Sequence, residues 1–193
     1  MNVQEETDLL ARAQAGDVAA FESFVRVFER RVRGLLSRLL GDERDIEEAA
    51  QDTFVQAWRN LSRFRGDAAP FTWLYRIAVN EALQRSRRRR LETQPIDAEV
   101  LEVLEYQHGA AGSPRPPDLV LEGREAHAFL LERVRRLPFE FRAPVVLRDI
   151  EGWSNQEVAD ILELSLPATK SRIHRGRMKL REELELWVRE RDR

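Results

Sequence analysis

Apolar residues in the N-terminal half of the chain recur every three or four positions, the period of a helix that buries one face. One stripe runs from Phe21 to Leu39, between Asp17, a residue type that caps helices, and Gly41. The pattern predicts four consecutive helices: over about residues 5–15, from Asp17 to Gly41, from Asp42 to about residue 62, and from Pro70 into residues 85–90. A loop is predicted over residues 63–69.

The middle of the chain breaks this pattern. Residues 93–123 contain Pro95, Gly109 and a proline-rich run near 114–117, which cannot continue a helix. Helical spacing returns beyond them and predicts helices near residues 124–136, 139–150, 154–162 and 167–190. We therefore expect an all-α protein with two small helical domains, residues 1–92 and 124–193, joined by a flexible linker over residues 93–123.

The last two predicted helices have the order of a helix-turn-helix. Ser154 can cap the first of them, with Glu157 as its capping-box partner, and Pro167 suits the first turn of the second. On the second helix Ile173 and Leu180 face inward, and Gly176 allows close approach. The remaining positions carry many cations: Lys170, Arg172, Arg175, Arg177, Lys179 and Arg181.

A cationic second helix fits the major groove of DNA, where side chains near its N-terminal end reach base edges. The same charges also fit an ordinary helical hairpin with a solvated basic face. The order of capped helix, turn and proline-started helix favours DNA binding, as does the concentration of cations on the second helix.

Composition excludes several other classes of protein. The 193 residues include no cysteine, which rules out disulfides and thiolate metal sites, and the three histidines are scattered. No apolar run reaches the roughly 20 residues that cross a bilayer, and the acidic N-terminus is unlike a signal peptide. We expect a cytoplasmic protein with no metal, no cofactor and no insertion into membranes.

The charge distribution is more informative than the net charge of −2. Residues 93–123 carry six acidic groups and one basic group, so the linker has a charge of −5, whereas both flanking regions are slightly positive. A flexible chain of this length spans roughly 30 Å on average and on the order of 100 Å when stretched. The two domains can therefore reach DNA sites two helical turns apart, about 70 Å, only if the linker is drawn out.

With these parts in place, the chain resembles an extracytoplasmic-function (ECF, group IV) sigma factor, a promoter-specificity subunit of bacterial RNA polymerase. The N-terminal motifs that carry the resemblance are residues 45–58 (DIEEAAQDTFVQAW), 64–66 (FRG) and 72–80 (TWLYRIAVN). The C-terminal motifs are residues 137–138 (LP), 146–149 (VLRD), 152–154 (GWS) and 170–177 (KSRIHRGR). The resemblance covers nearly the whole chain.

The resemblance implies that the helix over residues 45–58 docks on a coiled coil of the largest polymerase subunit. The expected polymerase-binding residues form a polar, acidic strip: Glu47, Glu48, Gln51, Asp52 and Gln56. A solvent-exposed helix face that binds no partner has the same pattern of polar and acidic residues.

The loop after this helix and the next helix would bind the minus-ten promoter element, holding a flipped base and the phosphates of the melted strand. The residues implied are Arg63, Phe64, Arg65, Gly66, Asp67, Tyr75, Arg76 and Asn80. The arginines at 85–90 are further candidates for phosphate contacts, although they also suit a solvated helix C-terminus, where the dipole favours cations.

In the C-terminal domain, the family pattern places Ser171, His174 and Arg175 toward base edges of the minus-thirty-five element. Lys170, Arg172 and Arg177 would lie toward phosphates. The chain departs from the family at residues 167–169, where Pro-Ala-Thr replaces the common Gly-Thr-Val, so no base contact is assigned to Thr169.

The resemblance implies three partners: core RNA polymerase, promoter DNA and an anti-sigma factor, which in this family is often membrane-anchored. It implies no catalytic residue in the chain. In the family the linker threads toward the polymerase active site and RNA exit, and a charge of −5 would suit a positively charged channel.

Two other functions fit the sequence less well. A dimeric transcription regulator would need a dimerisation element, but the N-terminal half shows no heptad seam. A DNA recombinase would need a catalytic domain of α/β pattern, and no strand-like alternation is present.

Overall fold

The computed structural model describes residues 3–66, 68–93 and 124–191. All regular elements within these ranges are helices, which confirms the predicted all-α class. They are α1 (Val3–Gln14), α2 (Val18–Leu39), α3 (Glu43–Arg59), the 3₁₀ turn η1 (Leu61–Arg63), α4 (Pro70–Thr93), α5 (Arg124–Arg136), α6 (Phe139–Val145), the π-helical turn η2 (Val146–Ile150), α7 (Asn155–Leu162) and α8 (Leu166–Arg191). Nearly all of the predicted linker, and Asp67, lie outside the described residues.

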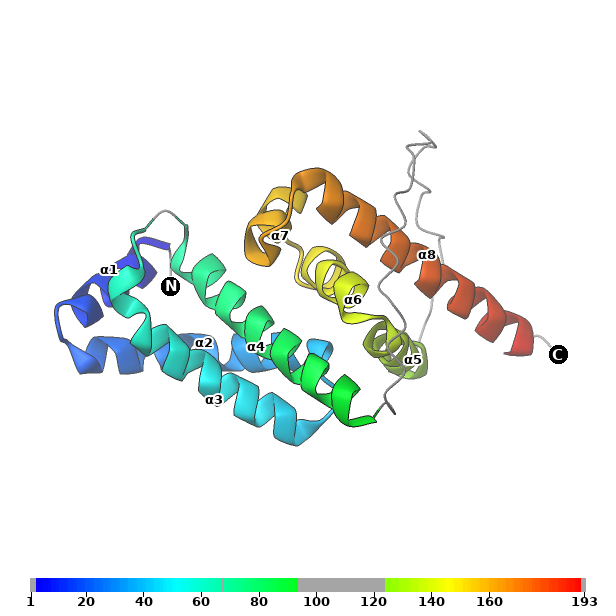
Figure 1. Cartoon of the computed structure of the whole chain (residues 1–193), viewed down its shortest axis with the longest axis horizontal. Coiled ribbons are helices and arrows are strands. Elements are labelled where there is room, and N and C mark those ends of the chain that lie inside the picture. The colour runs from blue at the N-terminus through cyan, green and yellow to red at the C-terminus, as the bar shows by residue number, and fades with distance from the viewer. Residues whose placement is uncertain (1–2, 67, 94–123, 192–193) are drawn as a thin grey trace.

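Helices α1 to α4 form the N-terminal module (Figure 1). The predicted caps are present: Asp17 accepts a hydrogen bond from the Ala20 amide at 3.0 Å, and Asp42 accepts one from the Arg44 amide at 2.9 Å. Each cap satisfies an amide that the first helical turn leaves unpaired. The predicted apolar stripe of α2 is buried, and Phe24 and Phe28 are fully inaccessible to solvent.

Helices α5 to α8 form the C-terminal module, in which α8 packs closely on α6. Gly176 makes this approach possible, as the sequence predicted. A Cβ atom on Gly176 would lie 2.6 Å from Val145 Cγ2 and 3.2 Å from the Phe141 carbonyl oxygen. Ile173 and Leu180 are buried on the same face of α8.

The predicted helix over residues 139–150 is wrong in its second half, where the chain forms the π-helical turn η2. The Glu151 amide donates to the Val146 carbonyl at 2.9 Å, five residues back. Pro144 lies just before this turn and has no amide hydrogen to donate, so the α-helical ladder is already interrupted there. The wider turn changes the direction in which the side chains of residues 149–153 project.

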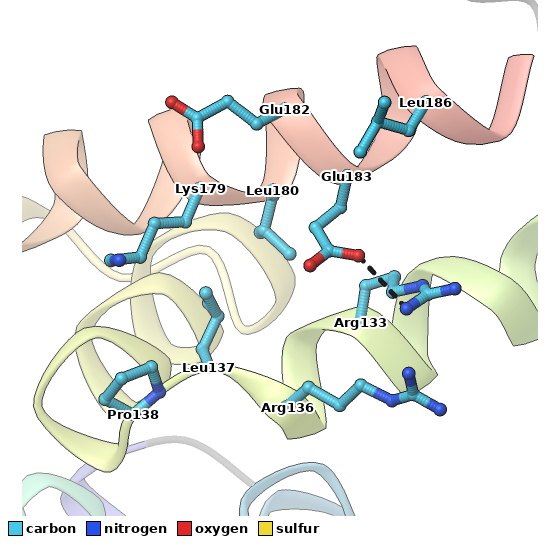
Figure 2. Close-up of a pocket in the computed structure, with 9 residues that line it drawn as sticks. All are labelled: Arg133, Arg136, Leu137, Pro138, Lys179, Leu180, Glu182, Glu183 and Leu186. Atoms are coloured by element: carbon cyan, nitrogen blue, oxygen red, sulfur yellow. Dashed lines mark ion pairs between the residues drawn. The ribbon is translucent and has the colours of Figure 1, made fainter. Parts of the chain in front are cut away.

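The C-terminal half of α8 extends along α5 (Figure 2). Leu137 and Leu180 point toward one another across a hollow of about 290 Å³, and Arg133 forms an ion pair with Glu183 at 3.0 Å. Phe129 of α5 stacks on Trp187 with ring centroids 4.6 Å apart. These contacts hold α8 along most of its length.

The two modules pack against one another, with α2 touching α5 and α6, and α4 touching α6 and α7. Arg142 donates to the Leu39 carbonyl at 2.7 Å and Arg135 donates to the Ser37 carbonyl at 3.1 Å. Both carbonyls belong to the last turn of α2, whose acceptors have no partner within the helix. No helix in the described parts of the chain is long and apolar enough to cross a membrane.

Candidate nucleic-acid interface

Helices α7 and α8 form the predicted helix-turn-helix. The Ser154 amide donates to the Glu157 carboxylate at 2.8 Å and the Glu157 amide donates to Ser154 Oγ at 3.2 Å, so the predicted capping box is present. The hydrogen bonds from Ser154 hold the pKa of Glu157 below its usual value. Glu163 makes the turn with φ of 54°, the left-handed conformation that often follows a helix C-terminus.

The start of α8 differs slightly from the prediction. Ser165 Oγ accepts a hydrogen bond from the Ala168 amide at 3.3 Å and therefore caps α8, which begins at Leu166, one residue before Pro167. Thr169 is fully buried, and its hydroxyl donates to the Ser165 carbonyl at 3.1 Å. Thr169 thus serves the helix start, consistent with its having no assigned base contact.

The outward face of α8 is open to solvent. Lys170, Ser171 and His174 are exposed, while Arg172 and Arg175 are half-buried. Figure 1 shows α8 on the side of the C-terminal module away from α1 to α3. The predicted base-contacting residues therefore lie together on the exposed side of the second helix of a helix-turn-helix.

Arg177, the third predicted phosphate contact, has a partner within the module. Its guanidinium donates to both carboxylate oxygens of Asp149, at 2.5 and 3.0 Å. This bidentate pair raises the pKa of Arg177 and ties the middle of α8 to the π-helical turn. Arg177 is thus less available for phosphate than Lys170.

The loop after α3 is fixed by α1. The side-chain amide of Gln14 donates to the carbonyls of Leu61 and Phe64, each at 2.8 Å. The Phe64 ring packs on Trp73 with centroids 5.1 Å apart, and Gly66 has φ of 79°, a conformation that favours glycine. Arg63 and Arg65 are exposed on this loop, and Asn80 is exposed on α4.

Tyr75 and Arg76 have different surroundings, because the C-terminal module covers them. Tyr75 is 1% exposed, and its hydroxyl donates to Glu151 at 3.1 Å. Burial, reinforced by the charge of Glu151, raises the pKa of Tyr75. Arg76 donates to the Asp160 carbonyl at 2.7 Å and lies 3.5 Å from the Glu163 carboxylate.

Both modules are similar in sequence to known protein families. The family model for Sigma-70 region 2 matches residues 24–92, and that for Sigma-70 region 4 matches residues 130–180. The RNA polymerase sigma-H factor of Pseudomonas aeruginosa is 32% identical over 189 residues, which are 97% of each chain. The ECF RNA polymerase sigma-E factor of Escherichia coli K12 is 34% identical over 171 residues, covering 88% of each.

This chain belongs to the ECF family of RNA polymerase sigma factors. Solved structures agree. The complex of CnrH with the cytosolic domain of CnrY aligns with a TM-score of 0.67 at 26% identity, over 94% of this chain and 98% of that chain. The sigma factor RpoE of Bartonella quintana, solved with the anti-sigma factor NepR, aligns with a TM-score of 0.60 at 24% identity, over 86% and 96% of the two chains.

The acidic strip that the sequence predicts on this sigma factor lies along α3. Glu47, Glu48, Gln51 and Asp52 are exposed, and Gln56 is half-buried. Three of the carboxylates take part in ion pairs with neighbouring arginines: Glu47 with Arg33, Glu48 with Arg44 at 3.0 Å, and Asp52 with Arg85. The exposed pairs of Glu47 and Glu48 are weak, so these two carboxylates can exchange partners at little cost, whereas Asp52 pairs with the buried Arg85.

The arginines at 85–90 only partly fit the predicted phosphate contacts. Arg85 is 8% exposed and bridges Asp52 and Glu81, the latter at 3.0 Å. Arg89 pairs with Asp42 at 2.8 Å and with Asp45 at 2.5 Å. These two arginines fasten the end of α4 to α3, so in this sigma factor they are structural side chains. Sequence spacing gave no sign of these partners.

Among the residues described, no group of three or more histidine, aspartate or glutamate side chains could hold a metal ion. The candidate sites that the sequence predicts lie on three surfaces: the outward face of α8, the loop and helix around Arg63 to Asn80, and the acidic strip of α3.

Proposed function

We propose that this sigma factor binds core RNA polymerase, directs it to specific promoters and stabilises the melted DNA at which transcription begins. The observation that carries the proposal is the outward face of α8, on which Ser171, His174 and Arg175 lie. The helix-turn-helix that presents this face lies within the residues that match the Sigma-70 region 4 model. In this proposal Arg175 is bidentate to a guanine of the minus-thirty-five element, with Ser171 and His174 on neighbouring bases. Lys170 and Arg172 bind phosphates.

The minus-ten element would be bound by the N-terminal module. The loop that carries Arg63 and Arg65 is anchored by Gln14, so its arginines project from a fixed backbone. A fixed cationic loop captures an unpaired strand at a lower entropic cost than a mobile one. We propose that Phe64, Gly66 and Asp67 bind a flipped base, with Arg76 and Asn80 continuing the surface along α4. Tyr75 can join this surface only where the C-terminal module leaves it uncovered, because its side chain is 1% exposed in this structure.

Docking on polymerase would use the acidic strip of α3. Its carboxylates project from the exposed side of a helix whose other side is packed in the core, as Ile46 and Ala49 are buried. Complementary basic side chains on polymerase would steer and orient the complex. Chemistry would then remain with polymerase, because the relatives of this chain are sigma factors and not enzymes.

We also propose that the protein works in the cytoplasm and is held inactive by an anti-sigma factor. The support is the fold that it shares with a sigma factor solved in complex with the anti-sigma factor NepR. Nothing in this proposal requires the chain itself to enter a membrane.

In-vitro transcription tests the function directly. The purified chain is mixed with sigma-free core polymerase and a pool of promoter fragments, and the transcripts are sequenced. We expect start-site-selective RNA that depends on the added chain. Absence of both a stable complex with core enzyme and selective transcripts would refute the proposal.

A charge reversal tests the docking surface separately. Glu48→Arg places a cation in the acidic strip, and we expect it to lower the affinity for core polymerase about ten-fold or more. Glu22→Arg is the matched control, since Glu22 is also exposed and pairs with an arginine four residues away on its own helix. Equal affinity of the two variants for polymerase would exclude α3 as the docking surface.

A further inference from the structure

Gln14, the last residue of α1, connects this helix to the loop after α3. Helix α1 packs beside the 3₁₀ turn η1 that begins the loop (Figure 1). The side-chain nitrogen of Gln14 donates to the carbonyl oxygens of Leu61 and Phe64, each at 2.8 Å. A glutamine amide has two N–H groups on this nitrogen, enough for both carbonyls. A single side chain therefore fixes the backbone of the loop at two points.

The backbone that carries Gln14 is itself held in place. Leu10 and Ala13 are buried, so the last turns of α1 belong to the core of the N-terminal module. The Arg12 guanidinium donates to the Asp17 carboxylate at 2.6 and 3.0 Å, which bridges the turn between α1 and α2. Gln14 therefore holds the loop from a rigid support, which a residue that orients a binding site requires.

The hydrogen bond to Phe64 also determines the direction of the next amide. A peptide unit is planar and trans, so its C=O and N–H groups point in opposite directions. Because the Phe64 carbonyl faces Gln14, the N–H of Arg65 is directed away from α1. Within the described residues, the Arg65 amide has no hydrogen-bond acceptor. This N–H group is therefore a donor that is held in one orientation and is available to a ligand.

The neighbouring side chains restrain the same peptide unit. The Phe64 ring packs on Trp73 of α4 with centroids 5.1 Å apart, so a second helix holds the Phe64 side chain. Gly66 follows with φ of 79°, a conformation in which a side chain would be strained. The Phe64–Arg65 peptide unit thus lies between fixed neighbours, and Gln14 supplies the hydrogen bond that sets its rotation.

A donor in a fixed orientation can distinguish one base from another. The bases carry their hydrogen-bond acceptors at different places on their edges. A mobile loop can follow the acceptor of any base, whereas a fixed N–H group meets only an acceptor at the position that it faces. Restraint of the loop therefore contributes to the choice of base as well as to affinity.

We propose that Gln14 is a positioning residue for base selection: it orients the Phe64–Arg65 peptide unit so that the Arg65 amide donates to the flipped base of the minus-ten element. This role rests on the proposed function, which assigns that base to this loop. Helix α1 then takes part in promoter recognition, although it precedes residues 24–92, the part of the chain that matches the Sigma-70 region 2 model.

Three variants of the full chain separate this role from folding. Gln14→Glu keeps the size of the side chain, but a carboxylate has no N–H group and repels the two carbonyl oxygens. Gln14→Ala adds no charge and so controls for repulsion between Glu and DNA phosphates. Gln4→Ala is the matched control, because Gln4 is an exposed glutamine of the same helix that donates to Asp8, 2.9 Å away. Circular dichroism melts verify that all three variants fold.

Base selection is measured on holoenzyme assembled from core polymerase and each variant. The probes are labelled single strands from the minus-ten region of a promoter selected by transcription, with every base tested at each position. For both Gln14 variants, the preference at one position, that of the flipped base, should fall about three- to ten-fold, the effect of losing one or two partly solvated hydrogen bonds. Preferences at the other positions should not change, and Gln4→Ala should match the wild type.

A merely structural role for Gln14 would give a different result. An equal loss of affinity for every strand, or unchanged base preferences in both Gln14 variants, would overturn its role in base selection. If wild-type holoenzyme is not promoter-selective, the proposed function fails and base selection by this loop fails with it. Selective transcription by the wild type, together with unchanged preferences in the variants, rejects only the role of Gln14.

Discussion

The two surfaces proposed to bind promoter DNA differ in their accessibility. On α8, Ser171 and His174 are exposed to solvent. On α4, Tyr75 is 1% exposed and Arg76 donates to α7. The first surface is open to solvent in this structure, while part of the second is packed against the C-terminal module.

The difference arises from what each helix packs against. α8 turns Ile173, Gly176 and Leu180 toward its own module, which leaves Lys170, Ser171 and His174 exposed to solvent. α4 packs on α2 and α3 of the N-terminal module and also on α6 and α7 of the C-terminal module, and its Leu74 and Tyr75 side chains are buried. A helix packed on two sides can offer DNA only the face that its second neighbour releases.

The largest expected effect comes from disturbing the packing that holds α8 on α6. Gly176→Val would place side-chain atoms within the space now filled by Val145 and the Phe141 backbone, and we expect a loss of about 3 kcal/mol in the free energy of unfolding of the C-terminal module. Urea unfolding followed by circular dichroism measures it. Gly41→Val is the control, because nothing lies within 4 Å of a Cβ there. Equal stability of the two variants would contradict the close packing of α8 on α6.

A change on the open surface that leaves the packing intact should affect specificity. Arg175→Ala should weaken binding to promoters with the preferred guanine by about 1–3 kcal/mol, or about five- to 150-fold. Promoters that lack this guanine should lose much less. The check is run-off transcription on a set of promoters with single substitutions in the minus-thirty-five element. A uniform loss across the set would remove Arg175 from base recognition.

The sequence predicted those features that neighbouring residues determine. Asp17, Asp42 and the pair Ser154–Glu157 are caps because a short polar side chain just before an apolar stripe satisfies free amides nearby. The inward position of Gly176 followed from helical spacing. The spacing does not predict the cap at Ser165, because Pro167 suits a first helical position and so indicates a later start for this helix.

The features that were missed depend on residues far apart in the chain. Nothing in the spacing pairs Arg177 with Asp149 or Arg85 with Asp52, since periodicity separates exposed from buried positions but does not identify partners. The π-helical turn had one local sign, Pro144. The covering of Tyr75 by Glu151 depends on how two modules meet, and no pattern within either module encodes that.

Removing a phosphate contact from α8 should lower the affinity for promoter DNA less than removing a base contact does. Lys170→Ala should weaken all promoters by a similar few-fold factor and reduce the slope of log K against log salt by about 0.9. Arg177→Ala should change this slope less, because Arg177 is held by Asp149. Fluorescence anisotropy at several salt concentrations measures both. Identical slopes for Arg177→Ala and Lys170→Ala would show that the Asp149 pair does not restrain Arg177.

The smallest expected effect is at the start of α7. This helix is joined to α8 by the turn, and the Asp160 carbonyl near its C-terminus accepts a hydrogen bond from Arg76 of α4. Glu157→Gln keeps an acceptor for the Ser154 amide but removes the negative charge at the helix N-terminus, a loss of about 0.5 kcal/mol at pH 7. The hydrogen bonds from Ser154 lower the folded-state pKa of Glu157, so this contribution is complete above the unfolded pKa of about 4.3. It disappears as the pH falls through the lowered folded-state pKa.

The stability difference between Glu157→Gln and the wild type should therefore shrink in acid, and urea unfolding at neutral and acidic pH measures it. A difference that stays constant with pH would mean that the carboxylate does not support the helix through its charge.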